Sequence, residues 1–128
     1  MGVILHFHYT NSEVATRVIT QNEIKFQTYP TPSSSLIGNG ENLNDNQWHH
    51  IVATYSSSDG EMTLTIDEGL TNSSSATGSI RSYNQVRIGA ITHTDIPSSA
   101  IDAIIDDIRI YNRALTEHEI TELYNEAQ

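Results

Sequence analysis

Carboxylates in the last third of the sequence are the residues best placed to do chemistry. An apolar segment from Ile101 to Tyr111 carries Asp102, Asp106 and Asp107. If this segment is a β-strand, alternation places Asp106 on one face together with three isoleucines. A buried carboxylate needs hydrogen bonds, a cation or a metal to replace its lost water. Either backbone amides of a neighbouring loop donate to Asp106, or it binds structural calcium together with Asp102 and Asp107.

The other acidic residues do not have the spacing of a glycosidase. Retaining cleavage needs two carboxyl groups about 5 Å apart. Glu61 and Asp67 lie at opposite ends of one predicted strand, and Glu68 follows Asp67 directly, so these two would face opposite sides. The sequence also has neither a Gly-x-Ser-x-Gly elbow nor a glycine-rich phosphate loop. We therefore expect no enzymatic activity.

Histidines are the next candidates for a site. His6 and His8 share one face of a predicted strand, a spacing that can bind zinc if a third ligand converges, but that also fits a half-exposed polar stripe. His49 and His50 are adjacent and face opposite sides. We expect one of these two to hydrogen-bond at the edge of the core and the other to face solvent.

Exposed aromatic rings and asparagines favour a carbohydrate site. Sugars stack on aromatic rings and hydrogen-bond to amide side chains, and predicted strand ends and loops supply Tyr29, Asn42, Asn44, Tyr83 and Asn84. Asparagines of this kind also serve as ordinary turn residues. Trp48, in contrast, is predicted to lie in the core.

Composition excludes several classes of partner. The chain has 128 residues, with six Lys and Arg against sixteen Asp and Glu, and a formal net charge of −10. This charge argues against nucleic acid and against an anionic membrane surface, and no apolar run is long enough for membrane insertion. Cysteine is absent, so there is no disulfide framework. Ser, Thr and Asn supply 38 residues, which suits strands and turns better than helices.

The hydropathy pattern predicts an all-β chain closed by one helix. We expect strands at Val3–Tyr9, Val14–Thr20, Ile24–Tyr29, Trp48–Tyr55, Met62–Asp67, Gln85–Ile91 and Ile101–Tyr111. The fourth and fifth form a hairpin, whereas Ser33–Gln47 and Thr71–Gly78 read as loops. Thr116 and Glu119 have the spacing of a capping box, and Ile120, Leu123 and Tyr124 recur at helical spacing. Strands spaced in this way predict an antiparallel two-sheet sandwich.

Two segments resemble the concanavalin A-like lectin and glucanase jelly rolls, in their laminin G-like and pentraxin-like branch. Trp48–Tyr55 with Met62–Asp67 looks like the central hairpin of that family, and Val86–Gly89 resembles the strand that follows. Ile105–Thr116, continued to Tyr124, looks like the closing strand and C-terminal helix. The likeness covers Trp48 to Tyr124, while the 47 residues before it resemble a shortened first half.

This resemblance implies a single, shortened jelly-roll domain over residues 1–128, non-catalytic and lectin-like, that recognises carbohydrate or a glycosylated partner. It also implies calcium, because domains of this type often bind calcium through loop carboxylates. Charge and composition favour an extracellular or cell-surface location. Residues 1–8 carry no signal-peptide pattern.

A structural or assembly role is the alternative. A shortened sandwich has open sheet edges, which invite pairing with another chain. We expect a homo-oligomer, or pairing with a second chain, along the long apolar strand Val3–Tyr9.

Overall fold

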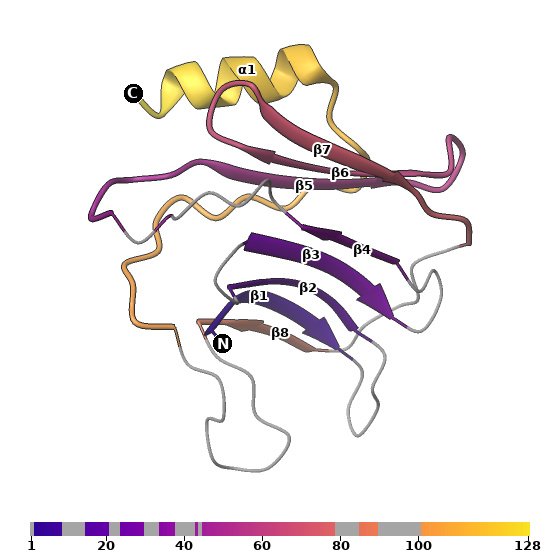
Figure 1. The fold of residues 1–128 in the computed structure, drawn as a ribbon, viewed down its shortest axis with the longest axis horizontal. Helices are drawn as coiled ribbons and strands as arrows, with labels where there is room; N and C mark the ends of the chain where they lie inside the picture. The colour runs from indigo at the N-terminus through magenta and orange to yellow at the C-terminus, as the bar shows by residue number, and fades with distance from the viewer. Residues whose placement is uncertain are drawn as a thin grey trace.

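The computed structural model describes residues 2–8, 15–20, 24–29, 34–37, 43, 45–78, 85–89 and 101–128, and within these it contains two antiparallel sheets and one helix. The five-stranded sheet consists, in spatial order, of β4 (Ser34–Ile37), β3 (Ile24–Tyr29), β2 (Ala15–Thr20), β1 (Gly2–His8) and β8 (Gln85–Ile88). The three-stranded sheet consists of β5 (Ile51–Ser56), β6 (Glu61–Ile66) and β7 (Leu70–Ser75). Figure 1 shows α1 (Glu117–Glu126) over the face of the smaller sheet that points away from the larger one.

Strand β1 lies inside the larger sheet and not at its edge. It pairs with β2 on one side and with β8 on the other, with Phe7 opposite both Thr16 and Val86. The prediction that Val3–Tyr9 forms an open seam for another chain was therefore wrong. From Leu5 to His8 this strand has a partner on both sides, and the outer strands of the described sheet are β4 and β8.

The predicted hairpin is confirmed as β5 and β6, and it supplies most of the described core. Ile51 pairs with Ile66 at one end and Ser56 with Glu61 at the other. Alternation turns Met62, Leu64 and Ile66 of β6 to one face, where they are 0%, 1% and 2% exposed. Phe26 of β3 and Ala76 join the same cluster, so this core ties the two sheets together.

Two strands were missed in the sequence, because their residues read as loops. Strand β4 is four residues long and half serine, and β7 is Leu-Thr-Asn-Ser-Ser-Ser. Serine and asparagine are common turn residues, so stretches rich in them do not indicate a strand by themselves. Both strands form because a strongly apolar neighbour offers a free edge: β7 pairs with β6 and β4 pairs with β3.

The segment Ile101–Tyr111 is not a strand, which corrects the sequence-based prediction. Within the described chain, its link to the sheets by a backbone hydrogen bond is Ile101 N to Gly89 O at 2.8 Å. Asp107 has a φ of 49°, a left-handed conformation that breaks the extended backbone halfway. Asp106, which alternation placed in the core, is exposed.

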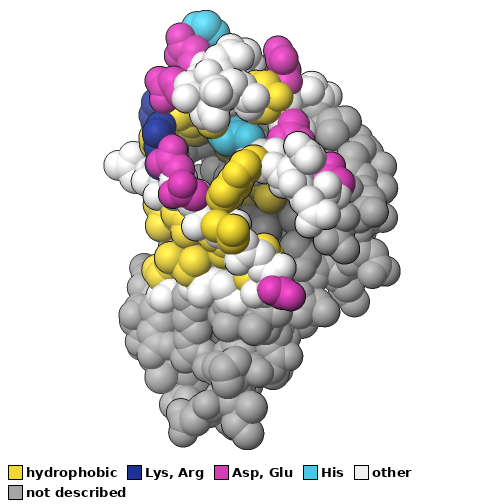
Figure 2. All heavy atoms as spheres, turned by 90° about the vertical axis from the view of Figure 1, so that its left-hand side faces the viewer, with side chains coloured by type: hydrophobic (Ala, Val, Ile, Leu, Met, Phe, Trp, Pro, Cys, Tyr) yellow, Lys and Arg dark blue, Asp and Glu magenta, His cyan; other side chains and the backbone are white. Residues whose placement is uncertain are grey.

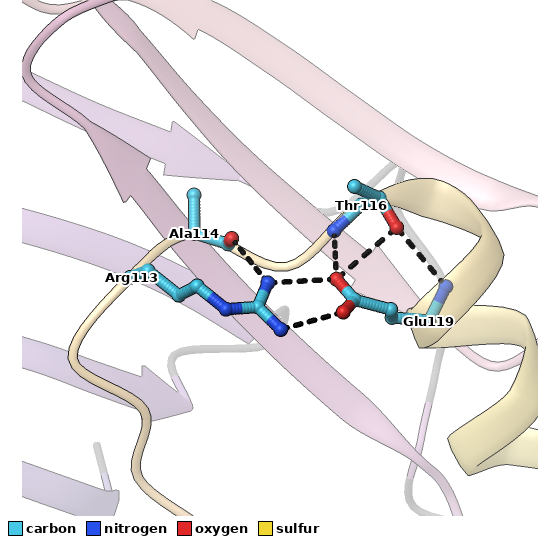
Figure 3. Close-up of polar contacts among 4 residues, drawn as sticks. All are labelled: Arg113, Ala114, Thr116 and Glu119. Atoms are coloured by element: carbon cyan, nitrogen blue, oxygen red, sulfur yellow. Dashed lines mark hydrogen bonds and ion pairs between the residues drawn. The ribbon is translucent and has the colours of Figure 1, made fainter.

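The predicted C-terminal helix and its capping box are confirmed. Thr116 Oγ1 accepts a hydrogen bond from Glu119 N at 3.3 Å, and Glu119 Oε2 accepts one from Thr116 N at 2.8 Å. Arg113 donates to both carboxylate oxygens of Glu119, at 2.8 and 2.5 Å (Figure 3). The bonds from Arg113 lower the pKa of Glu119 to about 2. Ile120 is a buried residue of this helix, so the cap fixes the point at which the apolar face of the helix begins.

Removing the cap should destabilise this end of the chain. We expect Thr116→Ala to lower the free energy of unfolding by about 1 kcal/mol, because one amide of the first turn loses its acceptor. Thr121→Ala is the matched control, since the Thr121 hydroxyl donates to Glu117 O in the middle of the same helix. Urea denaturation followed by circular dichroism measures both, and equal losses in the two variants would contradict the role given to the cap.

Candidate functional site

An open, polar hollow lies at the end of the smaller sheet. It has a volume of about 380 Å³ and is lined by Asp59, Gly60, Glu61 and the serines Ser73–Ser75. The β5–β6 turn supplies the first two residues, β6 supplies Glu61, and β7 supplies the serines. Pairing of β6 with β7 sets Glu61 directly opposite Ser75.

Local hydrogen bonds hold the acidic turn in place. The Ser56 hydroxyl donates to Asp59 Oδ2 at 2.5 Å, and Asp59 N donates back to Ser56 Oγ at 3.3 Å. Gly60 has a φ of 64°, which glycine adopts without strain, and its carbonyl accepts from Ala76 N at 2.8 Å. The turn is thereby joined to the end of β7. The two exposed carboxylates can accept hydrogen bonds from a neutral polyol, and the serine hydroxyls beside them can donate as well as accept. The carboxylates would repel an anion.

No sequence motif indicated this hollow. The turn and the Ser-rich stretch were read as separate connections, 14 residues apart between Asp59 and Ser73. The unexpected strand β7 brings them together, because it returns antiparallel to β6.

The paired histidines differ in environment, but both are partly buried, so the expectation that one of them faces solvent was wrong. His49 is held between two carboxylates, with Nδ1 2.7 Å from Asp67 Oδ2 and Nε2 3.0 Å from Asp45 Oδ1. The hydrogen bond to Asp67 is the largest cause that raises the pKa of His49, and the contact with Asp45 adds to it. Asp67 Oδ1 also accepts from His50 N at 2.8 Å. Asp67 therefore joins the start of β5 to the β6–β7 turn.

His50 lies in the opposite environment. Its ring is half-buried and stands 5.9 Å from the ring of Tyr124 in α1, measured between centroids. Burial lowers the pKa of His50. The contact packs the helix against the start of β5, so His50 serves as a packing residue.

Most of the predicted sugar-binding residues lie outside the described part of the chain. Asn42, Asn44, Tyr83 and Asn84 are among these. Tyr29 is the last residue of β3, opposite Ala15 of β2. The carbohydrate site built on these five residues stays a prediction.

The three aspartates proposed for calcium lie on the exposed segment. Asp107 accepts from Arg109 through both oxygens, at 3.1 and 3.0 Å, and Asp106 Oδ1 accepts from Asp107 N at 2.8 Å. Asp102 is exposed as well. Among the described residues there is no group of three or more His, Asp or Glu able to hold a metal ion. Calcium prefers six to eight oxygen ligands, and calcium binding at these aspartates stays a prediction.

A large apolar surface takes the place of the expected closing strand. Five large side chains are exposed on it, and we call them the apolar surface: Trp48 (68%), Ile104 (80%), Ile108 (40%), Ile110 (60%) and Tyr111 (44%). Trp48 was expected to lie in the core, and this expectation was wrong, because no described strand covers it. Figure 2 shows hydrophobic side chains gathered on one face of the described part of the molecule.

Comparison with known proteins identifies the family. The sequence model Laminin_G_3, described as Concanavalin A-like lectin/glucanases superfamily, matches residues 2–121. The chain belongs to this superfamily, whose fold is a jelly-roll β-sandwich. A search of curated proteins found no match.

A solved structure shares the fold. It is a 2.1 Å crystal structure of an S-layer domain-containing protein, residues 221–444, from Clostridium thermocellum ATCC 27405, with a TM-score of 0.50 and 23% sequence identity. The match covers 95% of this chain and 62% of that one. In the part of the chain described by the structure, no helix has the length and apolar character needed to cross a membrane.

Proposed function

We propose that this chain is a non-catalytic, lectin-like module of the cell surface that binds carbohydrate or a glycosylated partner. The observation that carries the proposal is the hollow formed by Asp59, Glu61 and Ser73–Ser75. It presents carboxylate and hydroxyl groups at the end of the smaller sheet, and such groups can hydrogen-bond to sugar hydroxyls. Membership of the concanavalin A-like superfamily supports a binding role, and likeness to an S-layer domain-containing protein supports the location.

The described carboxylates favour binding over catalysis. The acid of a glycosidase lies in an enclosed apolar site, whereas Asp59 and Glu61 are both exposed. Asp67, at the far end of β6, is held by His49 and His50. These surroundings support a binding role for the described acids.

Glycan binding tests the proposal. We expect neutral oligosaccharides on an array to bind and anionic ones to fail, since the hollow is acidic. The double variant Asp59→Asn/Glu61→Gln should weaken binding about tenfold, equivalent to about 1.4 kcal/mol. Glu68→Gln is the matched control, because this exposed carboxylate lies in the turn at the opposite end of β6.

Calcium belongs in the same experiment. Binding and thermal melting should be measured with calcium and with a chelator, because a ligand specific to the native state raises the melting temperature. A flat response to every glycan under both conditions would remove the lectin proposal. An unchanged melting temperature would remove calcium alone.

A structural or assembly role is the second candidate, favoured by the exposed apolar surface. A surface of five large apolar side chains is typical of a contact with another chain. In this role the chain would homo-oligomerise and would need no small-molecule ligand. Its mass in solution by multi-angle light scattering distinguishes an oligomer from a monomer.

A further inference from the structure

We propose that His49 is a pH-operated clamp, which holds residues 45–48 against the β6–β7 turn and releases them when its ring loses one proton. We call residues 45–48 the clamped turn. The two nitrogens of the His49 ring each contact a carboxylate oxygen, at 2.7 Å for Asp67 and at 3.0 Å for Asp45. Asp67 and the polar hollow lie at opposite ends of β6, so this inference is independent of the proposed lectin function.

Both contacts require the charged form of the ring. An ionised carboxylate only accepts hydrogen bonds, and a neutral imidazole has one N–H donor and one nitrogen that accepts. The charged ring of His49 therefore donates to Asp67 and Asp45 at once, whereas the neutral ring can donate to one of them alone. At its other nitrogen, a lone pair would then face a carboxylate oxygen, and this contact is repulsive.

The contact with Asp45 is the one that should open. The contact with Asp67 is shorter, and the Asp67 side chain is 27% exposed against 44% for Asp45. Asp67 is also held from a second side, because its Oδ1 accepts a hydrogen bond from His50 N at 2.8 Å. A neutral His49 therefore keeps its proton on Nδ1 for Asp67, and Nε2 changes from a donor to an acceptor.

Asp45 organises the chain that leads into β5. Its Oδ1 accepts from Gln47 N at 2.9 Å as well as contacting His49 Nε2. Asn46 has a φ of 62°, a left-handed conformation that asparagine tolerates better than most residues. Leu43, two residues before Asp45, packs against the core cluster. The clamped turn thus lies between two anchored residues, and loss of the Asp45 contact releases the turn while the contact of Leu43 with the core remains.

Two carboxylates determine the pH at which the clamp opens. Within the described chain, Asp67 and Asp45 are the groups that raise the pKa of His49 above 6.5, and partial burial of the ring opposes them. The ring is therefore charged, and the clamp closed, below pH 6.5. The clamp opens as pH rises through the higher pKa of the folded chain.

His50 titrates separately from the clamp. Its ring packs toward Tyr124 in α1, and its pKa is lowered, chiefly by burial. The charges of Asp67, Arg109 and Asp107 also act on this ring. A change caused by His50 thus falls below pH 6.5, on the opposite side from the opening of the clamp.

The fluorescence of Trp48 tests the clamp. Trp48 is the single tryptophan of the chain, is 68% exposed and belongs to the clamped turn. We expect its fluorescence anisotropy to fall in one step with a midpoint above pH 6.5, because the released turn reorients faster. NMR titration of the His49 ring nitrogens should give the same midpoint, since one proton causes both changes.

Three variants identify the groups involved. His49→Gln should remove the step, and Asp45→Ala should give the low anisotropy of the released turn at every pH. His118→Gln is the matched control, because it removes an exposed histidine that contacts a carboxylate, that of Glu122, in α1. This variant should keep the step and its midpoint.

The results separate a clamp from a histidine with only a structural role. A step that coincides with the titration of His49, is lost in His49→Gln and persists in His118→Gln supports the clamp. A flat anisotropy while His49 titrates overturns it, as does a step that survives in His49→Gln. If His49→Gln does not fold, as circular dichroism would show, Asp45→Ala decides, because it removes a carboxylate that is 44% exposed. A step of unchanged size in Asp45→Ala also overturns the clamp.

Discussion

Replacing Leu64 by alanine should lower the free energy of unfolding by about 2–5 kcal/mol. Leu64 is 1% exposed, in the centre of the cluster formed by Phe26, Met62 and Ile66. The substitution removes apolar contacts and leaves a cavity that neighbours from two sheets fill only in part. Such a loss is a large share of the stability of a small domain, about 5–15 kcal/mol in total. Urea denaturation measures it.

Milder substitutions test the same core if Leu64→Ala leaves the chain unfolded. Ile66→Val removes one methylene group from the same cluster and should lose about 0.5–1.5 kcal/mol. Ile110→Ala, on an exposed side chain, should lose less than about 0.5 kcal/mol. If Ile110→Ala were as harmful as Leu64→Ala, the segment Ile101–Tyr111 would be part of the core in solution, contrary to the structure.

Replacing Asp67 by alanine should have the second largest effect, about 2–4 kcal/mol, because two hydrogen bonds are lost and one of them links charged groups. Asp67 accepts from His50 N and contacts His49, and its φ of 53° is better tolerated by Asp or Asn than by Ala. Asp67→Asn keeps the backbone conformation and removes only the charge. It should therefore lose less stability than Asp67→Ala.

The effect of Asp67→Asn should depend on pH. The pKa of His49 is raised above 6.5 in the folded chain, chiefly by Asp67. The stabilisation from this pair is therefore complete below pH 6.5 and is lost as pH rises through the higher pKa of the folded state. The free energy of unfolding of the unaltered chain should therefore exceed that of Asp67→Asn by more at pH 5.5 than at pH 9.

The unaltered chain must be compared with Asp67→Asn because His50 also makes stability depend on pH. Its lowered pKa means that the fold loses stability as pH falls below 6.5, which opposes the contribution of His49. The difference between the two variants cancels the part of this contribution that burial of His50 causes, whereas a single stability curve does not. Asp67 also raises the pKa of His50 through its charge. In a His49→Gln background, the pH-dependent loss caused by Asp67→Asn should therefore shrink to this smaller part, and an undiminished dependence would assign the effect to another group.

Local patterns in the sequence predicted the parts of the fold that local forces form. Alternation in Met62, Leu64 and Ile66 correctly indicated one buried face of β6, and the spacing of Thr116 and Glu119 correctly indicated the helix cap. The same reasoning failed for Ile101–Tyr111, whose alternating isoleucines are exposed. Alternation indicates which side chains could share a face, but a strand also needs a neighbour with free backbone groups.

The sequence predicted less of the candidate site than of the fold. Asp59 and Glu61 were visible as residues of a turn, but Ser73–Ser75 have no strand propensity of their own and gained their place by pairing with β6. The partners of His49 likewise come from two different segments, at Asp45 and Asp67.

The sequence by itself determined the family, the acidic surface, the central hairpin and the capped helix, because each depends on residues close together in the chain or on composition. Tertiary structure alone decided which strands have neighbours, and hence that β1 is interior, that β7 completes a polar hollow and that Ile104, Ile108 and Ile110 stay exposed. The physical reason is that hydrogen bonds between strands and burial of side chains depend on distant segments meeting, and no local pattern specifies which segments meet.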